Sequence, residues 1–207
     1  MPYILAFIVG YLFGCSHMSY YISKLKNINI KENGSKNYGA SNTLILIGKK
    51  ESLLVLIHDF LKSFLVVKIL KIIFPELLYI DIIAGLSAVL GHIFPFYLKF
   101  NGGKGFASFI GLIFALDYKI GLITIIMILI VSFVSDKIVI GTFSTITISP
   151  ILLAFSNNDF KIIPIMYLVS IIIFIKHKDN IKNIINKKEP SLKKALFKNK
   201  NKNKKEE

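Results

Sequence analysis

Long apolar segments alternate with short polar breaks along most of the chain. A perpendicular helix needs about 20 apolar residues to cross the roughly 30 Å of hydrocarbon in a bilayer. The longer segments predict membrane-spanning helices, and the shorter ones predict tilted or partly re-entrant helices. The pattern therefore predicts an all-α polytopic membrane protein with about seven transmembrane helices. The apolar segments lie at residues 3–22, 53–74, 78–98, 105–117, 120–135, 138–156 and 161–175.

Composition and charge agree with this pattern. Apolar residues make up 54% of the chain, and the mean hydropathy is +0.62, which is typical of membrane proteins and rare in soluble domains. The net charge of +14 comes from lysine alone, because the chain contains no arginine. The lysines flank the apolar segments instead of interleaving with aromatic residues, so we expect no nucleic-acid partner.

The lysines gather in alternate loops and so indicate the orientation of the chain. One set of loops, at 24–50, 99–104 and 137 and after 175, is rich in lysine, whereas the other set, at 76–81, 117–119 and 159–161, holds four acidic residues and only two lysines. Lysine-rich loops are typically cytoplasmic. We therefore expect a multi-pass protein of the cell membrane with its N-terminus outside and its C-terminus in the cytoplasm, which requires an odd number of spans.

The composition changes near residue 187. Residues 1–186 hold the apolar segments, whereas 187–207 are rich in lysine, asparagine and glutamate. We expect a transmembrane domain followed by a disordered cytoplasmic tail that lies against anionic lipid headgroups.

Three polar clusters fall on the expected cytoplasmic side. The first, residues 34–43, is rich in glycine, hydroxyl and amide groups, including Ser35, Asn37 and Asn42. Such residues form turns whose N–H and O–H groups suit phosphate oxygens. An ordinary polar turn with a cap for the next helix fits the same residues.

The second cluster is Asn-Gly-Gly-Lys-Gly at 101–105. Backbone N–H groups exposed by glycine, together with Lys104, form an anion cradle, and a helix that follows adds the positive end of its dipole. The pattern lacks the spacing of a nucleotide P-loop. A flexible turn between helices is the alternative interpretation.

The third cluster follows the last apolar segment and contains His177 and Asn180. These two residues share a helix face if the helix continues. Histidine exchanges a proton near neutral pH, and an asparagine amide holds an oxygen in place. A plain interfacial stop sequence fits the same residues.

Two charged residues, Asp59 and Lys62, lie inside the second apolar segment. Charges at that depth are costly and are normally paired or face a polar cavity. They therefore predict either a structural ion pair or the floor of a site.

Together these motifs resemble the bacterial acyl-phosphate:glycerol-3-phosphate acyltransferase family (PlsY). Residues 34–42 match the family motif Gly-Ser-Gly-Asn-(Ile/Val)-Gly-Ala-Thr-Asn. Residues 91–105 match Gly-His-x-x-Pro followed by Gly-Gly-Lys-Gly, and 177–181 match His-Arg-x-Asn-Ile. The run Asp-Phe-Leu-Lys at 59–62 is shared as well. The chain departs from the family pattern where Lys36 replaces the middle glycine and Ile45 replaces an arginine. The family's Gly-Ser-x-Pro reads Gly-Cys-Ser-His at 14–17, so Cys15 and His17 replace a serine and a proline.

The resemblance implies transfer of an acyl chain from acyl phosphate to the 1-hydroxyl of glycerol 3-phosphate. It also implies a fold of seven transmembrane helices around a site that faces the cytoplasm, and no cofactor. The predicted partners are the two substrates and membrane lipids, while the oligomeric state is left open, a monomer included. The residues that we predict from the motifs and the resemblance are, for catalysis, His177, Asn180, Ser35 and Lys104, and, for substrate binding, Gly102, Gly103, Gly105, Asn37, Asn42, Lys62, Thr142 and His92.

Two other classes of function fit parts of the sequence. A small transporter or channel for an anionic solute would explain Asp59 and Lys62 and the interrupted helices. A structural membrane protein would give no role to Lys104 or Asn180. A metal site is not expected, because the histidines lack ligand spacing with cysteine or carboxylates.

Overall fold

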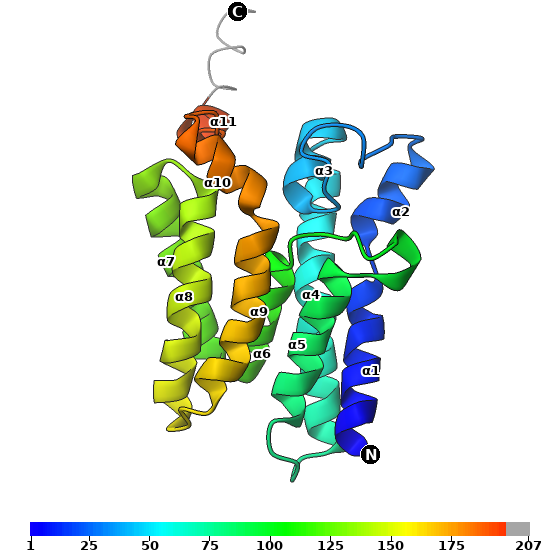
Figure 1. The fold of residues 1–207 in the computed structure, drawn as a ribbon, viewed down its shortest axis with the longest axis vertical. Coiled ribbons are helices and arrows are strands. Elements are labelled where there is room, and N and C mark those ends of the chain that lie inside the picture. The colour runs from blue at the N-terminus through cyan, green and yellow to red at the C-terminus, as the bar shows by residue number, and fades with distance from the viewer. Residues whose placement is uncertain (198–207) are drawn as a thin grey trace, which may run out of the picture. The chain divides into compact units, whose positions relative to one another are not determined.

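The computed structural model describes residues 1–197, and over this range the chain forms helices and no strand (Figure 1). It divides into two units, residues 1–121 and 122–207. Four helical stretches are long and apolar enough to cross a membrane: Pro2–Leu25, Ile80–Leu98, Tyr118–Ser135 and Ile138–Asn157.

The first unit is built on helices that pack side by side. Helix α5 packs against α1 and α4, and α6 packs against α4 and α5. Buried aliphatic residues such as Val66 and Ile80 form a core between α1, α4 and α5. The elements of this unit are α1 (Pro2–Cys15), α2 (Met18–Leu25), α3 (Ala40–Leu46), α4 (Lys49–Ile73), α5 (Ile80–Ile93), the 3₁₀ turn η1 (Phe96–Leu98) and α6 (Phe106–Leu116).

Small residues let α1 and α5 approach closely. A Cβ on Gly10 would collide with the carbonyl of Ala84, and one on Gly14 would lie 2.7 Å from the carbonyl carbon of Ala88. Glycines spaced four apart form the small-xxx-small surface that lets apolar helices pack backbone to backbone. The sequence Gly-Tyr-Leu-Phe-Gly at 10–14 therefore fixes the α1–α5 contact.

The first apolar segment is broken, which the sequence did not predict. We expected one helix over 3–22, but α1 ends at Cys15 and α2 begins at Met18. Ser16 and His17 have extended backbones between them. A break inside an apolar segment leaves carbonyl groups without partners in the helix. Polar side chains from α4 and from η1 donate hydrogen bonds to these carbonyls.

The second unit contains most of α7 (Tyr118–Ser135), α8 (Ile138–Asn157), α9 (Ile162–Lys176), α10 (Lys178–Ile185) and α11 (Leu192–Phe197). Helices α8 and α9 pack against each other. The rings of Phe143 and Phe174 meet with centroids 4.8 Å apart, and the hydroxyl of Tyr167 donates to the carbonyl of Thr147 at 2.6 Å. Each of these contacts links α8 to α9.

The structure differs from the expected disordered tail over residues 187–197. The backbone N–H of Lys193 donates to Oδ1 of Asp136 at 2.7 Å, and the N–H of Leu192 donates to the backbone carbonyl of Asp136 at 3.1 Å. Nζ of Lys137 donates to the carbonyl of Glu189 at 2.8 Å. This part of the tail is thus tied to the junction of α7 and α8, while the rest of the expected disordered segment, 198–207, lies outside the described residues.

Candidate functional site

Lys62 joins three helices of the first unit through one ammonium group. Nζ donates to the carbonyls of Gly14 and Ser16 at 2.9 and 2.7 Å and to Nδ1 of His92 at 2.8 Å. It also pairs with Oδ1 of Asp59 at 3.3 Å, and both charged side chains are buried. All three ammonium protons therefore have acceptors within the protein. Of the two interpretations that the sequence allowed, the geometry matches the structural ion pair, and a direct contact of Lys62 with substrate stays a prediction.

The glycine–lysine loop, residues 101–105, runs from the end of η1 to the start of α6. The N–H of Gly102 donates to the carbonyl of Ile93, and that of Gly103 to the carbonyl of His92, at 3.1 and 3.0 Å. We expected glycine to leave these N–H groups exposed, but the loop uses both of them to hold its own shape. The glycines serve close packing instead, because a Cβ on Gly103 would collide with the His92 ring.

Helix α6 begins directly after this loop. Gly105 is its N-cap, with φ of 89°, a conformation that glycine adopts far more readily than other residues. The N–H groups of a helix's first turn have no partner inside the helix and carry the positive end of its dipole. Lys104 precedes this helix start by two residues. The expectation of a lysine at the N-terminus of a helix is confirmed, and such a terminus suits an anion.

The first polar cluster lies against the glycine–lysine loop. A Cβ on Gly103 would lie 2.7 Å from the carbonyl of Tyr38. Nζ of Lys31 donates to Oδ1 of Asn101 at 2.8 Å. Two clusters that are about 65 residues apart in sequence are therefore neighbours in the fold, as the sequence predicted.

Asn42 organises the first cluster. Its side chain is fully buried, and its Oδ1 accepts the N–H of Ser35 at 2.8 Å. Its Nδ2 donates to the carbonyl of Ile30 at 2.9 Å and lies 3.2 Å from that of Asn37. In the structure Asn42 holds the loop that carries Ser35 and Asn37, and a contact of Asn42 with substrate stays a prediction.

Lys36 has a left-handed backbone with φ of 53°. This conformation costs a residue with a Cβ roughly 1–2 kcal/mol and costs glycine little. The departure from the family pattern, lysine in place of glycine, therefore introduces strain as well as charge. Nearby, burial raises the pKa of the Tyr38 phenol, so the hydroxyl remains a donor at neutral pH.

In the second unit, two predicted residues bond to their own helices. Nδ1 of His177 lies 2.8 Å from the carbonyl of Ile173, which can only accept, so Nδ1–H donates and Nε2 is the proton-accepting nitrogen of the neutral ring. The hydroxyl of Thr142 donates to the carbonyl of Ile138 at 3.2 Å. His177 also packs edge-on against Phe143, with ring centroids 5.8 Å apart. Both side chains are buried.

Asn180 contacts a residue that the sequence did not single out. Its Nδ2 donates to Oε1 of Glu189 at 2.8 Å. Glu189 is only 9% exposed, and its other carboxylate oxygen, Oε2, is buried without a hydrogen-bond partner. The sequence offered one signal, a lone acid followed by proline in a lysine-rich stretch. That signal is weak, because the composition of the stretch predicts disorder.

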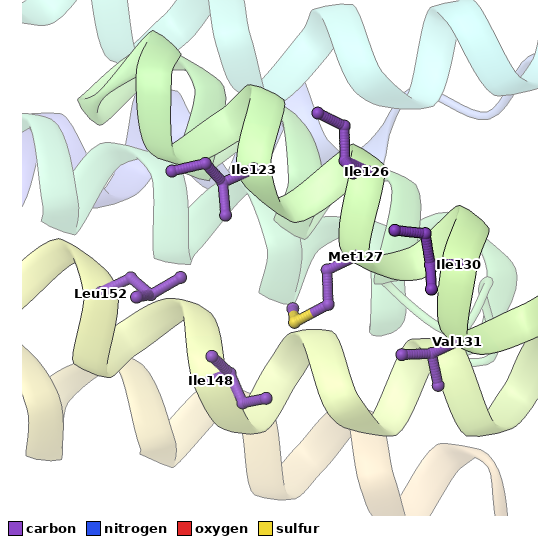
Figure 2. Close-up of a pocket in the computed structure, with 7 residues that line it drawn as sticks. All are labelled: Ile123, Ile126, Met127, Ile130, Val131, Ile148 and Leu152. Atoms are coloured by element: carbon purple, nitrogen blue, oxygen red, sulfur yellow. The ribbon is translucent and has the colours of Figure 1, made fainter.

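A groove of about 440 Å³ lies between α7 and α8 and is lined only by aliphatic side chains and one methionine (Figure 2). Five of these residues come from α7 and two from α8: Ile123, Ile126, Met127, Ile130, Val131, Ile148 and Leu152. A surface of this kind suits hydrocarbon and offers no group for proton transfer. The candidate chemistry therefore belongs to the polar clusters.

These features define a helical integral membrane protein with a basic, glycine-rich loop at the N-terminus of a buried helix. A family model described as glycerol-3-phosphate acyltransferase matches residues 4–187. Glycerol-3-phosphate acyltransferase 1 of Oceanobacillus iheyensis is 36% identical over 202 residues, covering 93% of this chain and 96% of the relative. The acyltransferase of Thermosipho melanesiensis is 33% identical over 186 residues, covering 90% of each chain.

The fold is also similar to solved structures. The crystal structure of PlsY (YgiH), an integral membrane glycerol 3-phosphate acyltransferase, in its glycerol 3-phosphate form aligns with a TM-score of 0.87 and 26% identity, covering 95% of this chain and all of that one. The lysophosphatidic acid form aligns with a TM-score of 0.85. The chain belongs to the glycerol-3-phosphate acyltransferase family, of the PlsY type.

Proposed function

We propose that this protein transfers a fatty acyl group from acyl phosphate to the 1-hydroxyl of glycerol 3-phosphate, releasing lysophosphatidic acid and inorganic phosphate. The observation that carries the proposal is the packing of the 34–43 cluster against the glycine–lysine loop at the start of α6. Basic, hydroxyl and amide groups beside a helix N-terminus suit two phosphate-bearing substrates. The glycerol 3-phosphate and lysophosphatidic acid forms of the similar solved PlsY support the acceptor and the product.

The membrane arrangement is part of the same proposal. Each of the seven apolar segments contains a helix, and the lysine-rich loops fall on one side when all seven cross the bilayer. The N-terminus is then outside, the C-terminus is in the cytoplasm, and the three polar clusters face the cytoplasm. Glycerol 3-phosphate enters from the cytoplasm, and the acyl donor enters from the bilayer.

In this proposal the phosphate of glycerol 3-phosphate binds to Lys104 and to the N–H groups at the start of α6, while Gly102, Gly103 and Gly105 shape the cradle. Ser35 and Asn37 contact the phosphate oxygens from the neighbouring loop. These donors are held in position before the substrates bind. They bring the two anionic substrates together and stabilise the negative charge that develops in the transition state.

An acyl phosphate is already activated, so the enzyme needs no covalent nucleophile. The 1-hydroxyl oxygen attacks the acyl carbon, the bond from that carbon to the phosphate oxygen breaks, and phosphate leaves with the electron pair. The hydroxyl proton passes to the substrate's own phosphate, while His177 and Asn180 orient the hydroxyl. In the alternative route, the proton passes to Nε2 of His177. A pH–rate profile that keeps its wild-type shape in His177→Ala would exclude the histidine as base.

The test of the function measures phosphate release from palmitoyl phosphate by the purified protein, with and without glycerol 3-phosphate. We expect release that depends on glycerol 3-phosphate and is lost in Asn180→Ala. Asn157→Ala is the matched control, because the Asn157 side chain donates to the carbonyl of Leu153, one turn back at the C-terminal end of α8. Well-folded protein that releases no phosphate would contradict the proposal, and uptake of a labelled anionic solute without acyl transfer would favour the transporter instead.

A further inference from the structure

We propose that His17, in the break between α1 and α2, is a positioning residue that holds the glycine–lysine loop in its binding shape. The inference rests on the proposed function, in which this loop receives the phosphate of glycerol 3-phosphate. His17 lies outside the three polar clusters that the sequence brought forward. It is the residue through which the broken first helix reaches the loop.

The His17 side chain is fully buried, and both of its ring nitrogens face carbonyl oxygens. Nδ1 lies 2.6 Å from the carbonyl of Cys15, and Nε2 lies 2.9 Å from the carbonyl of His92, which is 75 residues away in sequence. Carbonyl oxygens only accept, and a neutral imidazole carries one N–H, so the ring donates to one of these two carbonyls. We assign that N–H to Nε2, the donor that the loop requires. Nε2 is the atom directed toward the loop.

The carbonyl of His92 is the point where His17 and the loop meet. The same oxygen accepts the N–H of Gly103 at 3.0 Å, so one acceptor joins the imidazole to the loop backbone. The ring of His17 also stacks on that of His92, with centroids 4.8 Å apart and planes at 24°. His17 thereby fixes the carbonyl that anchors Gly103.

Packing supports the same role. A Cβ on Gly102 would lie 2.9 Å from Nε2 of His17, so the loop backbone passes directly over the imidazole. The ring of Tyr38, from the first cluster, meets His17 edge-on with centroids 6.1 Å apart. His17 therefore touches both surfaces between which the phosphate is proposed to bind, without itself being placed on the substrate.

Two substitutions separate the contacts of the two ring nitrogens. The Nε2 of glutamine reaches the position of the imidazole Nε2, whereas the Nδ2 of asparagine reaches only that of Nδ1. His17→Gln therefore keeps the donor to His92, and His17→Asn offers a donor only to Cys15. Tyr97→Phe is a matched control, because it removes the hydroxyl that donates to the carbonyl of Cys15 at 2.8 Å and leaves the loop contact in place.

The first measurement is hydrogen–deuterium exchange of the peptide that contains residues 100–105, in the full-length protein without substrate. We expect exchange about fivefold faster in His17→Asn, the size that corresponds to one lost buried hydrogen bond. We expect wild-type exchange in His17→Gln and Tyr97→Phe. Equal exchange in His17→Asn and His17→Gln would overturn the inference.

The second measurement separates KM from kcat. We expect His17→Asn to raise KM for glycerol 3-phosphate about fivefold with a smaller change in kcat, and His17→Gln to restore the wild-type value. A lower thermal midpoint with unchanged KM would mean that His17 is only structural and would overturn the inference. The exchange result does not depend on catalysis, so absence of acyl transfer in the wild type would overturn the proposed function alone.

Discussion

The polar groups of the first unit are held by contacts between distant parts of the chain, whereas those of the second unit are held mostly by their own helices. Lys62 bonds to carbonyls 46 and 48 residues away, but Thr142 and His177 bond to carbonyls four residues back. Burial of the long-range network also makes each of its members costly to remove. The comparison teaches that contacts between helices position Lys62 in the first unit, whereas the side chains of Thr142 and His177 in the second unit are oriented within their own helices.

The largest effect is expected from breaking the buried ion pair of the first unit. Lys62→Met leaves Asp59 as an unpaired buried charge and removes the donor to Gly14, Ser16 and His92, so we expect a loss of about 3–5 kcal/mol in the free energy of unfolding. Thermal unfolding in detergent micelles measures this.

The double substitution Asp59→Leu with Lys62→Met removes both charges and is the control. We expect it to be less destabilising than Lys62→Met alone, because no unpaired charge remains. Additive losses would mean that the pair is not coupled.

Substitutions in the second unit should lower the activity more than the stability. Glu189→Ala removes the acceptor that holds the Asn180 amide, and we expect kcat to fall roughly tenfold, the size of one hydrogen bond to a charged group. Glu189→Gln retains an acceptor oxygen and should recover most of this loss. Steady-state phosphate release measures both variants, with Lys188→Ala as the neighbouring control. Equal activity of Glu189→Ala and wild type would show that Asn180 is positioned without the hydrogen bond to Glu189.

A smaller effect tests the strain in the first unit's loop. Lys36→Gly relieves the left-handed backbone and should stabilise the protein by about 1 kcal/mol. Lys36→Ala removes the same charge but keeps a Cβ, so it should not stabilise. The difference in unfolding midpoint between the two variants isolates the backbone effect, and identical midpoints would assign any change to the charge.

The smallest effect concerns the attachment of the tail in the second unit. Hydrogen bonds from Ser191 and from the Lys193 backbone lower the pKa of the half-buried Asp136 carboxylate. Because the pKa is lowered in the folded state, the Asp136 carboxylate stabilises the tail attachment fully above its unfolded-state pKa of about 3.9. This stabilisation is lost as the pH falls through the folded-state pKa. We expect exchange of residues 192–194 to speed up below about pH 4 and not at neutral pH. Asp136→Asn should remove this pH dependence, and a pH dependence that survives in it would exclude Asp136 as the cause.

Much of the molecule could be predicted from the sequence. Long apolar segments located the membrane-spanning helices, and glycine, lysine, hydroxyl and amide residues marked three polar clusters, because these features depend on neighbours in the chain. The contact between the 34–43 cluster and the glycine–lysine loop is confirmed. The predicted convergence of His177 and Asn180 with these clusters stays a prediction, as do the number of spans and their orientation.

The sequence by itself determined that each of the seven apolar segments contains a helix and which residue types carry the candidate chemistry, since local composition encodes those properties. Only the tertiary structure decided that the first helix breaks at Ser16 and His17 and that His17 reaches the carbonyl of His92. It also decided that the N–H groups of Gly102 and Gly103 bond to carbonyls at the end of α5. It also decided that Glu189 is buried against Asn180. These contacts join residues that local pattern cannot pair, because their geometry exists only once the helices have packed.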